Sequence, residues 1–339
     1  MTLRLAEGFD KYGATSGNAI ATIGRHWTLT SSDPSNDTVP LIAGRYAGQA
    51  IKLSSMMGGL SIARSGITLG GATKLFVGFN VKSDSGSGGY AMTLSFGTNT
   101  SLNINHDGSA VLTIAGTTHA VTLGAITGWK NIELVLCPGG SAATQIFVDE
   151  VSVYSATETW TYGGTFTWDV TGSATIAIDD FYVLDNAGTT GNARLGKDAR
   201  VSTLFPSADT SVEEWSTVGT VNAFDAVDNV PDDATKYVKG TTDGQRIVFD
   251  FTNLATTPAV VAGVVLSALA SNLDGGDERD LKLIVDISGT PTEVGSVSTP
   301  ATTVSGHQTI LATDPSTSAA WAYAGVNALK AGLKVKTHV

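Results

Sequence analysis

The chain has 339 residues, of which 42% are hydrophobic and only 15% are charged, so it can bury a core and is neither a disordered polyampholyte nor a coiled coil. Its 20 Lys and Arg residues against 31 Asp and Glu residues give a net charge of −11, which argues against binding to nucleic acid or to an anionic membrane surface. A single Cys excludes an internal disulfide framework, and there is no stretch of 18 apolar residues to span a bilayer.

The first residues, MTLRLAEGFDKYG, lack the apolar segment of a secretory signal. Together with the single cysteine, this start predicts assembly in a reducing cytoplasm.

Short apolar alternations broken by Gly, Ser, Asn and Asp run through the first half of the chain and are typical of a β-sandwich. The strands predicted there are Ala43–Ser54, Leu75–Val81, Tyr90–Phe96, Leu102–Ile104, Val111–Ile114, the two arms of a hairpin in Trp129–Tyr154, and Thr175–Leu184. Within the first of them, Tyr46 is expected to face inward. Asp84–Tyr90 is predicted as a loop. Asn105–Gly108 is predicted as a hairpin turn, because Asp-Gly tolerates positive φ.

Between the two halves, the polar, Gly-rich stretch Asn186–Lys197 predicts a linker. The chain is therefore expected to consist of an N-terminal sandwich (residues 1–187), a linker (188–197) and a second, mainly β domain (198–339). One short helix is predicted in Ser318–Lys330, with Gly332 as its C-terminal stop. The strands predicted in the second domain are Val218–Ala223, Gln245–Phe251, Val260–Ala270, Leu281–Ile287 and Leu333–Lys336.

The sequence offers no arrangement that points to catalysis. It has no G-x-S-x-G or S-x-x-K for a nucleophile, no H-E-x-x-H pair for a metal and no glycine-rich phosphate loop. Cys137 ends the apolar run IELVLC and is interpreted as a small buried hydrophobe. A glycosidase needs two carboxylates on either side of a sugar, and the adjacent Asp149 and Glu150 cannot form such a pair. The protein is therefore not expected to be an enzyme.

Three acidic clusters offer the hard oxygen atoms that Ca²⁺ takes as ligands: Asp179-Asp180, Asp232-Asp233 and the run Asp274–Asp280. None has the D-x-[DN]-x-[DN]-G spacing of a dedicated calcium loop. The favoured interpretation is therefore a set of solvated loops that keep strand edges from aggregating. Asp274, Asp277 and Asp280 are the remaining calcium candidates, and no other cofactor is expected.

Four aromatic residues, Trp160, Tyr162, Phe166 and Trp168, recur at even spacing around Gly163-Gly164, so they share one face of a hairpin. Rings of this kind stack on sugars, and these four residues together with the Asp84–Tyr90 loop are the candidate glycan contacts. The alternative is that this face is the core, because alternating aromatic residues are the ordinary filling of a sandwich.

Three segments resemble strands of the concanavalin A-like and laminin G-like jelly rolls: Gly44–Leu53, Trp129–Val153 and Thr175–Leu184. One departure is Glu150, where that family usually has Gly. The resemblance covers about residues 1–186 and implies a jelly-roll sandwich. That fold serves lectins, glycosidases and purely structural domains, so it does not fix a function.

A second resemblance is to structural proteins of tailed bacteriophage virions. It covers most of residues 196–339 and is carried by Leu5–Tyr12, Gly196–Asp209, Trp215, Asp232–Val238, Asp314-Pro315, Trp321 and Val326–Ala328. It implies a virion protein assembled in the host cytoplasm.

The function expected from these observations is a non-enzymatic tail component, at the tail tip or in a fibre, that contributes to virion assembly and host attachment. Its expected partners are other virion proteins, further copies of itself in a homo-oligomer, and a glycan of the host surface. Two alternatives stay open, a capsid decoration or head-fibre protein and a carbohydrate-binding or carbohydrate-active lectin-like protein.

Overall fold

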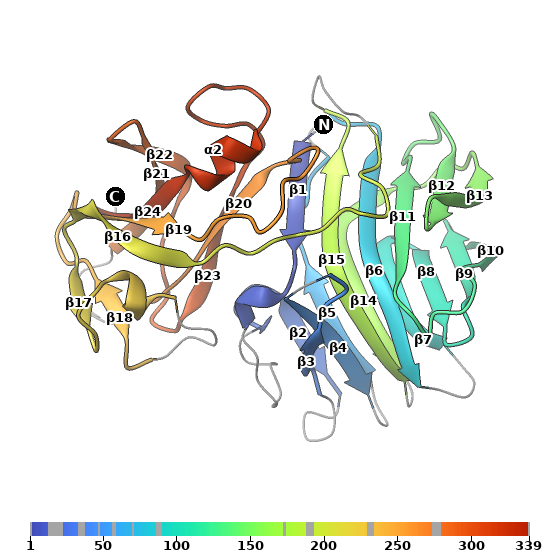
Figure 1. The fold of residues 1–339 in the computed structure, drawn as a ribbon. Coiled ribbons are helices and arrows are strands. Elements are labelled where there is room, and N and C mark those ends of the chain that lie inside the picture. Colours follow the sequence, from blue (N-terminus) through green and yellow to red (C-terminus); the bar gives the residue numbers. More distant parts are fainter. Residues whose placement is uncertain are drawn as a thin grey trace. The chain divides into compact units, whose positions relative to one another are not determined.

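The computed structural model describes residues 2–12, 23–32, 38–46, 48–55, 59–69, 71–85, 90–171, 174–187, 193–228, 234–272 and 279–337. The chain divides into two compact units, Met1–Val201 and Ser202–Val339. Each unit is built mainly of antiparallel strands, so the prediction of an all-β chain is confirmed (Figure 1). Within these ranges no helix is both long enough and apolar enough to cross a membrane.

The first unit is a sandwich of two antiparallel sheets. Over the described residues, the eight-stranded sheet has the order β13-β12-β11-β6-β15-β4-β3 with β1 also paired to β15, and the seven-stranded sheet has the order β10-β9-β8-β7-β14-β5-β2. The eight strands are β1 (Thr2–Glu7), β3 (Leu41–Ala43), β4 (Gln49–Ser55), β6 (Leu75–Ser85), β11 (Lys130–Leu136), β12 (Thr144–Val148), β13 (Val151–Ala156) and β15 (Ala174–Asp185). The seven strands are β2 (Thr28–Ser31), β5 (Gly59–Arg64), β7 (Tyr90–Gly97), β8 (Thr100–Asn105), β9 (Ser109–Ile114), β10 (Thr117–Thr122) and β14 (Tyr162–Thr171).

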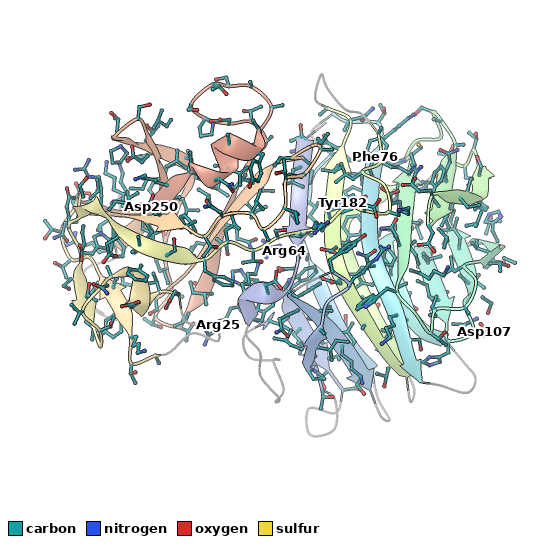
Figure 2. All side chains as sticks on the ribbon, viewed as in Figure 1. Arg25, Arg64, Phe76, Asp107, Tyr182 and Asp250 are labelled. Carbon is teal, nitrogen blue, oxygen red and sulfur yellow. The ribbon has the colours of Figure 1, made fainter. Side chains whose placement is uncertain are left out.

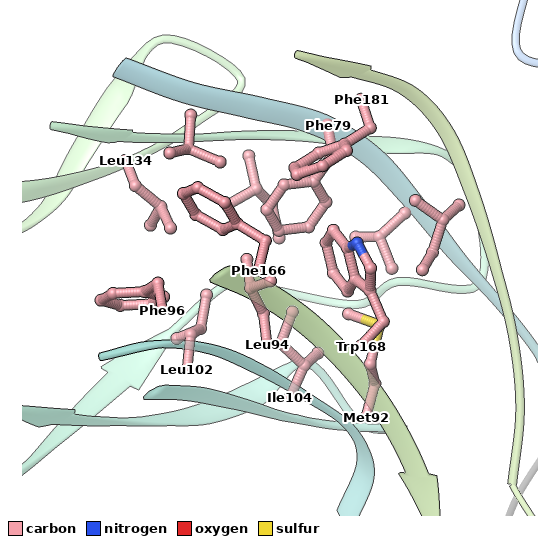
Figure 3. Packing of buried hydrophobic residues seen from close by; sticks show 14 of the residues in the cluster. Phe79, Met92, Leu94, Phe96, Leu102, Ile104, Leu134, Phe166, Trp168 and Phe181 are labelled. Carbon is pink, nitrogen blue, oxygen red and sulfur yellow. The ribbon is translucent and has the colours of Figure 1, made fainter. Parts of the chain in front are cut away.

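The core lies between these two sheets, because alternate residues of each strand point to the facing sheet. Figure 3 shows its aromatic centre, where the Trp168 ring meets Phe79 edge-on at 4.7 Å and Phe181 at 5.3 Å between ring centroids. Edge-to-face packing of this kind stabilises a core beyond the area it buries. Cys137 is also fully buried, as predicted.

Turns between the strands follow the predicted chemistry. Gly108 closes the β8–β9 hairpin with φ of 81°, so the predicted turn is confirmed. The chain returns from β12 to β13 through Asp149 (φ 45°) and Glu150 (φ 76°), both in the left-handed region that favours glycine. The predicted Asp84–Tyr90 loop is shorter than expected, because β6 runs to Ser85 and β7 starts at Tyr90. Residues 86–89 lie outside the described residues.

The second unit is built around a five-stranded sheet of order β16-β19-β24-β21-β22, accompanied in the described ranges by the pairs β17-β18 and β20-β23. Its strands are β16 (Pro206–Glu213), β17 (Ser216–Val218), β18 (Tyr237–Lys239), β19 (Arg246–Phe251), β20 (Val264–Ala270), β21 (Arg279–Ile287), β22 (Thr290–Ser298), β23 (Ser305–Leu311) and β24 (Lys330–Thr337). Trp215 and Trp321 are both buried, each in its own hydrophobic cluster.

The predicted short helix of the second unit is present, but its extent and one predicted strand are wrong. The helix α2 covers only Tyr323–Asn327, and Gly332 is not its stop but lies within β24, where an added Cβ would come 1.7 Å from the Ile247 carbonyl oxygen. The helix begins late because Ser318 lies in the left-handed region at φ of 58° and Ala322 is extended, and beyond it the chain pairs with β19 and β21 from Lys330 onward. The predicted strand Val218–Ala223 is wrong too, since β17 ends at Val218 and Gly219 turns the chain at φ of 83°.

The boundary between the units also differs from the prediction. It falls after Val201, whereas the linker was expected at residues 188–197. Residues 193–201, which we call the connector, belong to the first unit and donate hydrogen bonds to carboxylates of its eight-stranded sheet.

Candidate functional site

The four predicted glycan contacts lie in or against the core of the sandwich. Phe166 and Trp168 have no exposed surface, and Trp160 is 5% exposed. Tyr162 packs on the same cluster, with its ring centroid 5.8 Å from that of Phe166. These side chains therefore belong to the core. The prediction that they contact a glycan is wrong for Trp160, Phe166 and Trp168, because these rings are buried and no ring face is accessible to a sugar.

Of the calcium candidates, Asp274 and Asp277 lie outside the described residues. Asp280 is on β21, where its carboxylate accepts a 2.6 Å hydrogen bond from the Thr299 hydroxyl. The described part of the chain contains no group of three His, Cys, Asp or Glu side chains suited to a metal ion.

A different set of polar residues gathers on the outer face of the eight-stranded sheet. In β6, β11 and β15 alternate residues point to the core, and the residues between them point outward. Several of these outward residues are nevertheless buried and polar: Asn80, Asn131, Glu133, Asp179 and Tyr182 are each at most 3% exposed. Tyr182 lies on β15 opposite Gly78 of β6 (Figure 2). We call this set, together with Asp180, the polar face.

Glu133 is the centre of one half of the polar face. Its carboxylate accepts hydrogen bonds from the Tyr182 hydroxyl at 2.5 Å, from the Gly196 backbone N–H at 2.9 Å and from the Arg194 guanidinium. Burial, followed by the charge of Glu133, raises the pKa of Tyr182, so its hydroxyl stays a donor. Charge-assisted bonds of this kind are about twice as strong as neutral ones.

The connector supplies the cation for Glu133. Arg194 also lies over the Phe147 ring, 3.7 Å from its centroid, and reaches Glu150 with a 3.2 Å hydrogen bond. Glu150 in turn accepts a 2.8 Å bond from the Lys197 N–H. Glu150, which stands at the β12–β13 turn where the resembled family usually has glycine, thus holds the connector. This contact offsets the conformational energy that the left-handed backbone of Glu150 costs.

Asp179 and Asp180 form the other half of the polar face. Asp180 accepts bonds from the Val201 N–H at 2.7 Å and from the Asn80 amide at 2.8 Å. Asp179 accepts bonds from the backbone N–H groups of Arg45 and Asp180, both at 2.8 Å. The prediction of a solvated loop for this pair is wrong, because the residues are 2% and 5% exposed at an irregularity in the pairing of β15 with β6.

The loop between β3 and β4 covers the same region. The Arg45 guanidinium donates to Asn80 and to the Lys197 carbonyl oxygen, and the Tyr46 hydroxyl donates to that oxygen at 2.9 Å. Two cations lie over the Tyr46 ring, Arg45 at 5.0 Å and Arg200 at 4.7 Å from its centroid. Tyr46 was predicted to face inward but is 38% exposed, because it sits in this loop and not in a strand.

The arrangement closes the polar face with the protein's own chain. Among the described residues, Glu133, Asp179 and Asp180 each already accept at least two hydrogen bonds. A buried polar network with every member satisfied rigidifies a structure and fixes one arrangement of its parts. Sequence reasoning missed this site. The available signal was Asn80 and Glu133, polar residues inside the apolar runs LFVGFNV and NIELVL.

Comparison with known proteins gives weak likenesses only. No family model matches the sequence, and no curated protein matches it either. Among solved structures, a sialidase is similar at 14% identity and a TM-score of 0.43 over 55% of this chain, although the match spans only 19% of the sialidase. The carbohydrate esterase vb_24B_21 from Shiga toxin-encoding bacteriophage phi24B matches at 14% identity and a TM-score of 0.41, over 55% of this chain and 99% of its own. An endo-β-1,4-glucuronan lyase from Trichoderma reesei matches at 14% identity and a TM-score of 0.41, over 58% of this chain and 100% of its own. At these values none of them assigns a site or an activity to this protein.

Proposed function

We propose that this protein is a non-enzymatic structural component of a bacteriophage virion, and that it belongs to the tail. The observation that supports a structural role is the closed polar face. The carboxylates that an outer sheet face would need for acid–base chemistry on a sugar accept hydrogen bonds from Tyr182, Asn80 and the connector instead. The place in a virion rests on the sequence resemblance of the second half.

In this proposal the sandwich is a rigid domain that holds its contacts with other proteins in fixed positions. Its connector is bonded to the sheet up to Val201, and the second unit begins at Ser202. Other virion proteins, further copies of this chain and a host-surface glycan are the partners that such a role calls for.

The test is the number of copies per particle. Particles are purified from a culture of the strain that encodes the chain, and the protein is quantified by mass spectrometry with isotope-labelled peptides. We expect a few to about a dozen copies, as for a tail tip or fibre. Hundreds of copies would place the protein on the head and support the decoration alternative, and absence from the particles would overturn the proposal.

A second measurement addresses the carbohydrate alternative. Residues 1–201 are applied to a glycan array, and the full chain is incubated with polysaccharides while reducing ends and unsaturated products are followed. Release of sugar products would overturn the non-enzymatic assignment. Binding without turnover would support attachment to the host surface.

A further inference from the structure

One edge strand of the sandwich lacks the features that keep sheet edges apart. An edge strand has unpaired backbone groups that bind other strands, so most proteins shorten, bend or charge such strands. Among the described edges, β2 and β3 are only four and three residues long, and β1 carries Arg4 and a bulge. β13 has a bulge where its pairing with β12 shifts between Ser152 and Tyr154. β10, next to β9 in Figure 1, has none of these features.

β10 is regular, exposed and uncharged. It pairs with β9 over six consecutive residues without a register shift, and four of its six residues are exposed. Neither strand contains Asp, Glu, Lys or Arg. The one titratable side chain on β10, His119, alternates with the exposed residues and has its Nε2 atom 2.7 Å from Glu158. An edge of this kind is suited to binding a further strand.

The turn between β9 and β10 determines which backbone groups are free. Ala115 (φ 48°) and Gly116 (φ 89°) form a two-residue turn, so the flanking Ile114 and Thr117 make a hydrogen-bonded pair. In an antiparallel ladder such pairs alternate with pairs whose N–H and C=O groups point away from the partner strand. The residues of β10 whose N–H and C=O groups point away from β9 are therefore Thr118, Ala120 and Thr122.

A second copy of β10 matches these groups in one register. If two β10 strands run antiparallel about a two-fold axis at Ala120, each Ala120 faces its counterpart and Thr118 faces Thr122 of the second copy. All three residues are then in hydrogen-bonded pairs, with two bonds for each pair and about six in all. An axis at either threonine pairs fewer of them, because the strand ends at Thr117 and Thr122.

The distribution of charge favours a second copy as the partner. The chain has a net charge of −11, so two copies repel each other over most of their surfaces. β9 and β10 contribute no acidic side chain to that repulsion. The side chains that would face each other on the outer side of the sheet are alanine and threonine, which are small, and Thr–Thr pairs across strands are stabilising.

We propose that β10 is a self-pairing interface. Two copies of the chain join antiparallel through β10 about a two-fold axis at Ala120, and their seven-stranded sheets become one continuous sheet. This inference goes beyond the proposed function and holds whether or not the protein is part of a virion.

Sedimentation equilibrium of the full chain tests the association, from about 1 to about 200 µM. We expect a monomer–dimer equilibrium in the wild type. Ala120→Glu and Ala120→Lys each place like charges opposite each other, so each variant alone should dimerise at least about tenfold more weakly. An equimolar mixture of the two variants should recover dimers, because the opposite charges then face each other. A wild type that stays monomeric, or a mixture that associates no better than its components, would overturn the proposal.

Cysteine cross-linking tests the register. At the axis, the two Cα atoms of position 120 would lie about 5.5 Å apart, within the range of a disulfide. Oxidised Ala120→Cys should therefore form a covalent dimer. Thr118→Cys is the matched control on the same exposed face, since its counterparts would lie roughly 14 Å apart. The native Cys137 is buried. Equal cross-linking of the two variants would overturn the axis at Ala120.

Discussion

At the scale of single residues, the connector depends on a buried charge pair between Glu133 and Arg194. Glu133 is 1% exposed, so its charge has almost no access to water. Removing one partner of a buried pair costs more than the pair contributes, because the other charge is left uncompensated. Phe147 adds to this dependence, since the Arg194 guanidinium also lies over its ring.

Arg194→Ala is therefore expected to lower the free energy of unfolding of the first unit by about 3 kcal/mol, the lower end for a broken buried pair, because Tyr182 and Gly196 still donate to Glu133. Urea denaturation measures the loss. Arg200→Ala is the matched control on the same segment. Its guanidinium is exposed and lies over Tyr46, so it should cost only about 0.5 kcal/mol. Equal losses in the free energy of unfolding for the two variants would contradict the role of Glu133 as the buried partner of Arg194.

At the scale of elements, the connector belongs to the sandwich although it contributes no strand to it. A fragment of residues 1–201 keeps the Arg194, Gly196 and Val201 donors, whereas a fragment of residues 1–187 lacks all three. We expect the shorter fragment to be less stable by at least about 3 kcal/mol, the cost of losing Arg194 alone, which lowers its melting temperature by about 9 °C. Thermal unfolding of both fragments, followed by circular dichroism, decides this. Identical melting temperatures would show that the connector does not stabilise the sandwich.

The strands and the core were predictable because their signals are local. Alternation over Leu75–Val81 and the even spacing of Trp160, Phe166 and Trp168 each identify a buried face within a few residues. The connector was not predictable in this way. Its polar, Gly-rich composition is that of a linker, and its partner Glu133 lies 61 residues away in the sequence.

A different physical reason explains the errors in the second unit. Ser318–Lys330 is rich in alanine, which favours a helix in isolation. The helix nevertheless begins only at Tyr323, because Ser318 lies in the left-handed region and Ala322 is extended. A propensity of a few tenths of a kcal/mol per residue does not offset these backbone conformations, and from Lys330 onward the chain pairs with β19 and β21, which buries Ala331 and Val335.

At the scale of the whole molecule, the two units contain titratable groups whose contributions to stability change in opposite directions with pH. In the first unit the pKa values of Asp179 and Asp180 are raised, chiefly by burial. A raised carboxyl pKa contributes stability that is complete below about pH 4 and is lost as the pH rises through the folded-state values. In the second unit, burial lowers the pKa of His307 on β23. That histidine contributes stability that is present above about pH 6.5 and is lost as the pH falls.

Calorimetry of the full chain should therefore show two transitions that move in opposite directions. On acidification from pH 8 to pH 5.5, the transition of the first unit should shift to higher temperature and that of the second to lower temperature. Glu7 and Asp149 do not reverse the first shift, because their pKa values are lowered and their contributions are lost only below about pH 4.5. His307→Gln should abolish only the shift of the second unit, which assigns the transitions. Parallel movement of both transitions would mean that the units unfold together, and that Val201 is not where one cooperative unit ends.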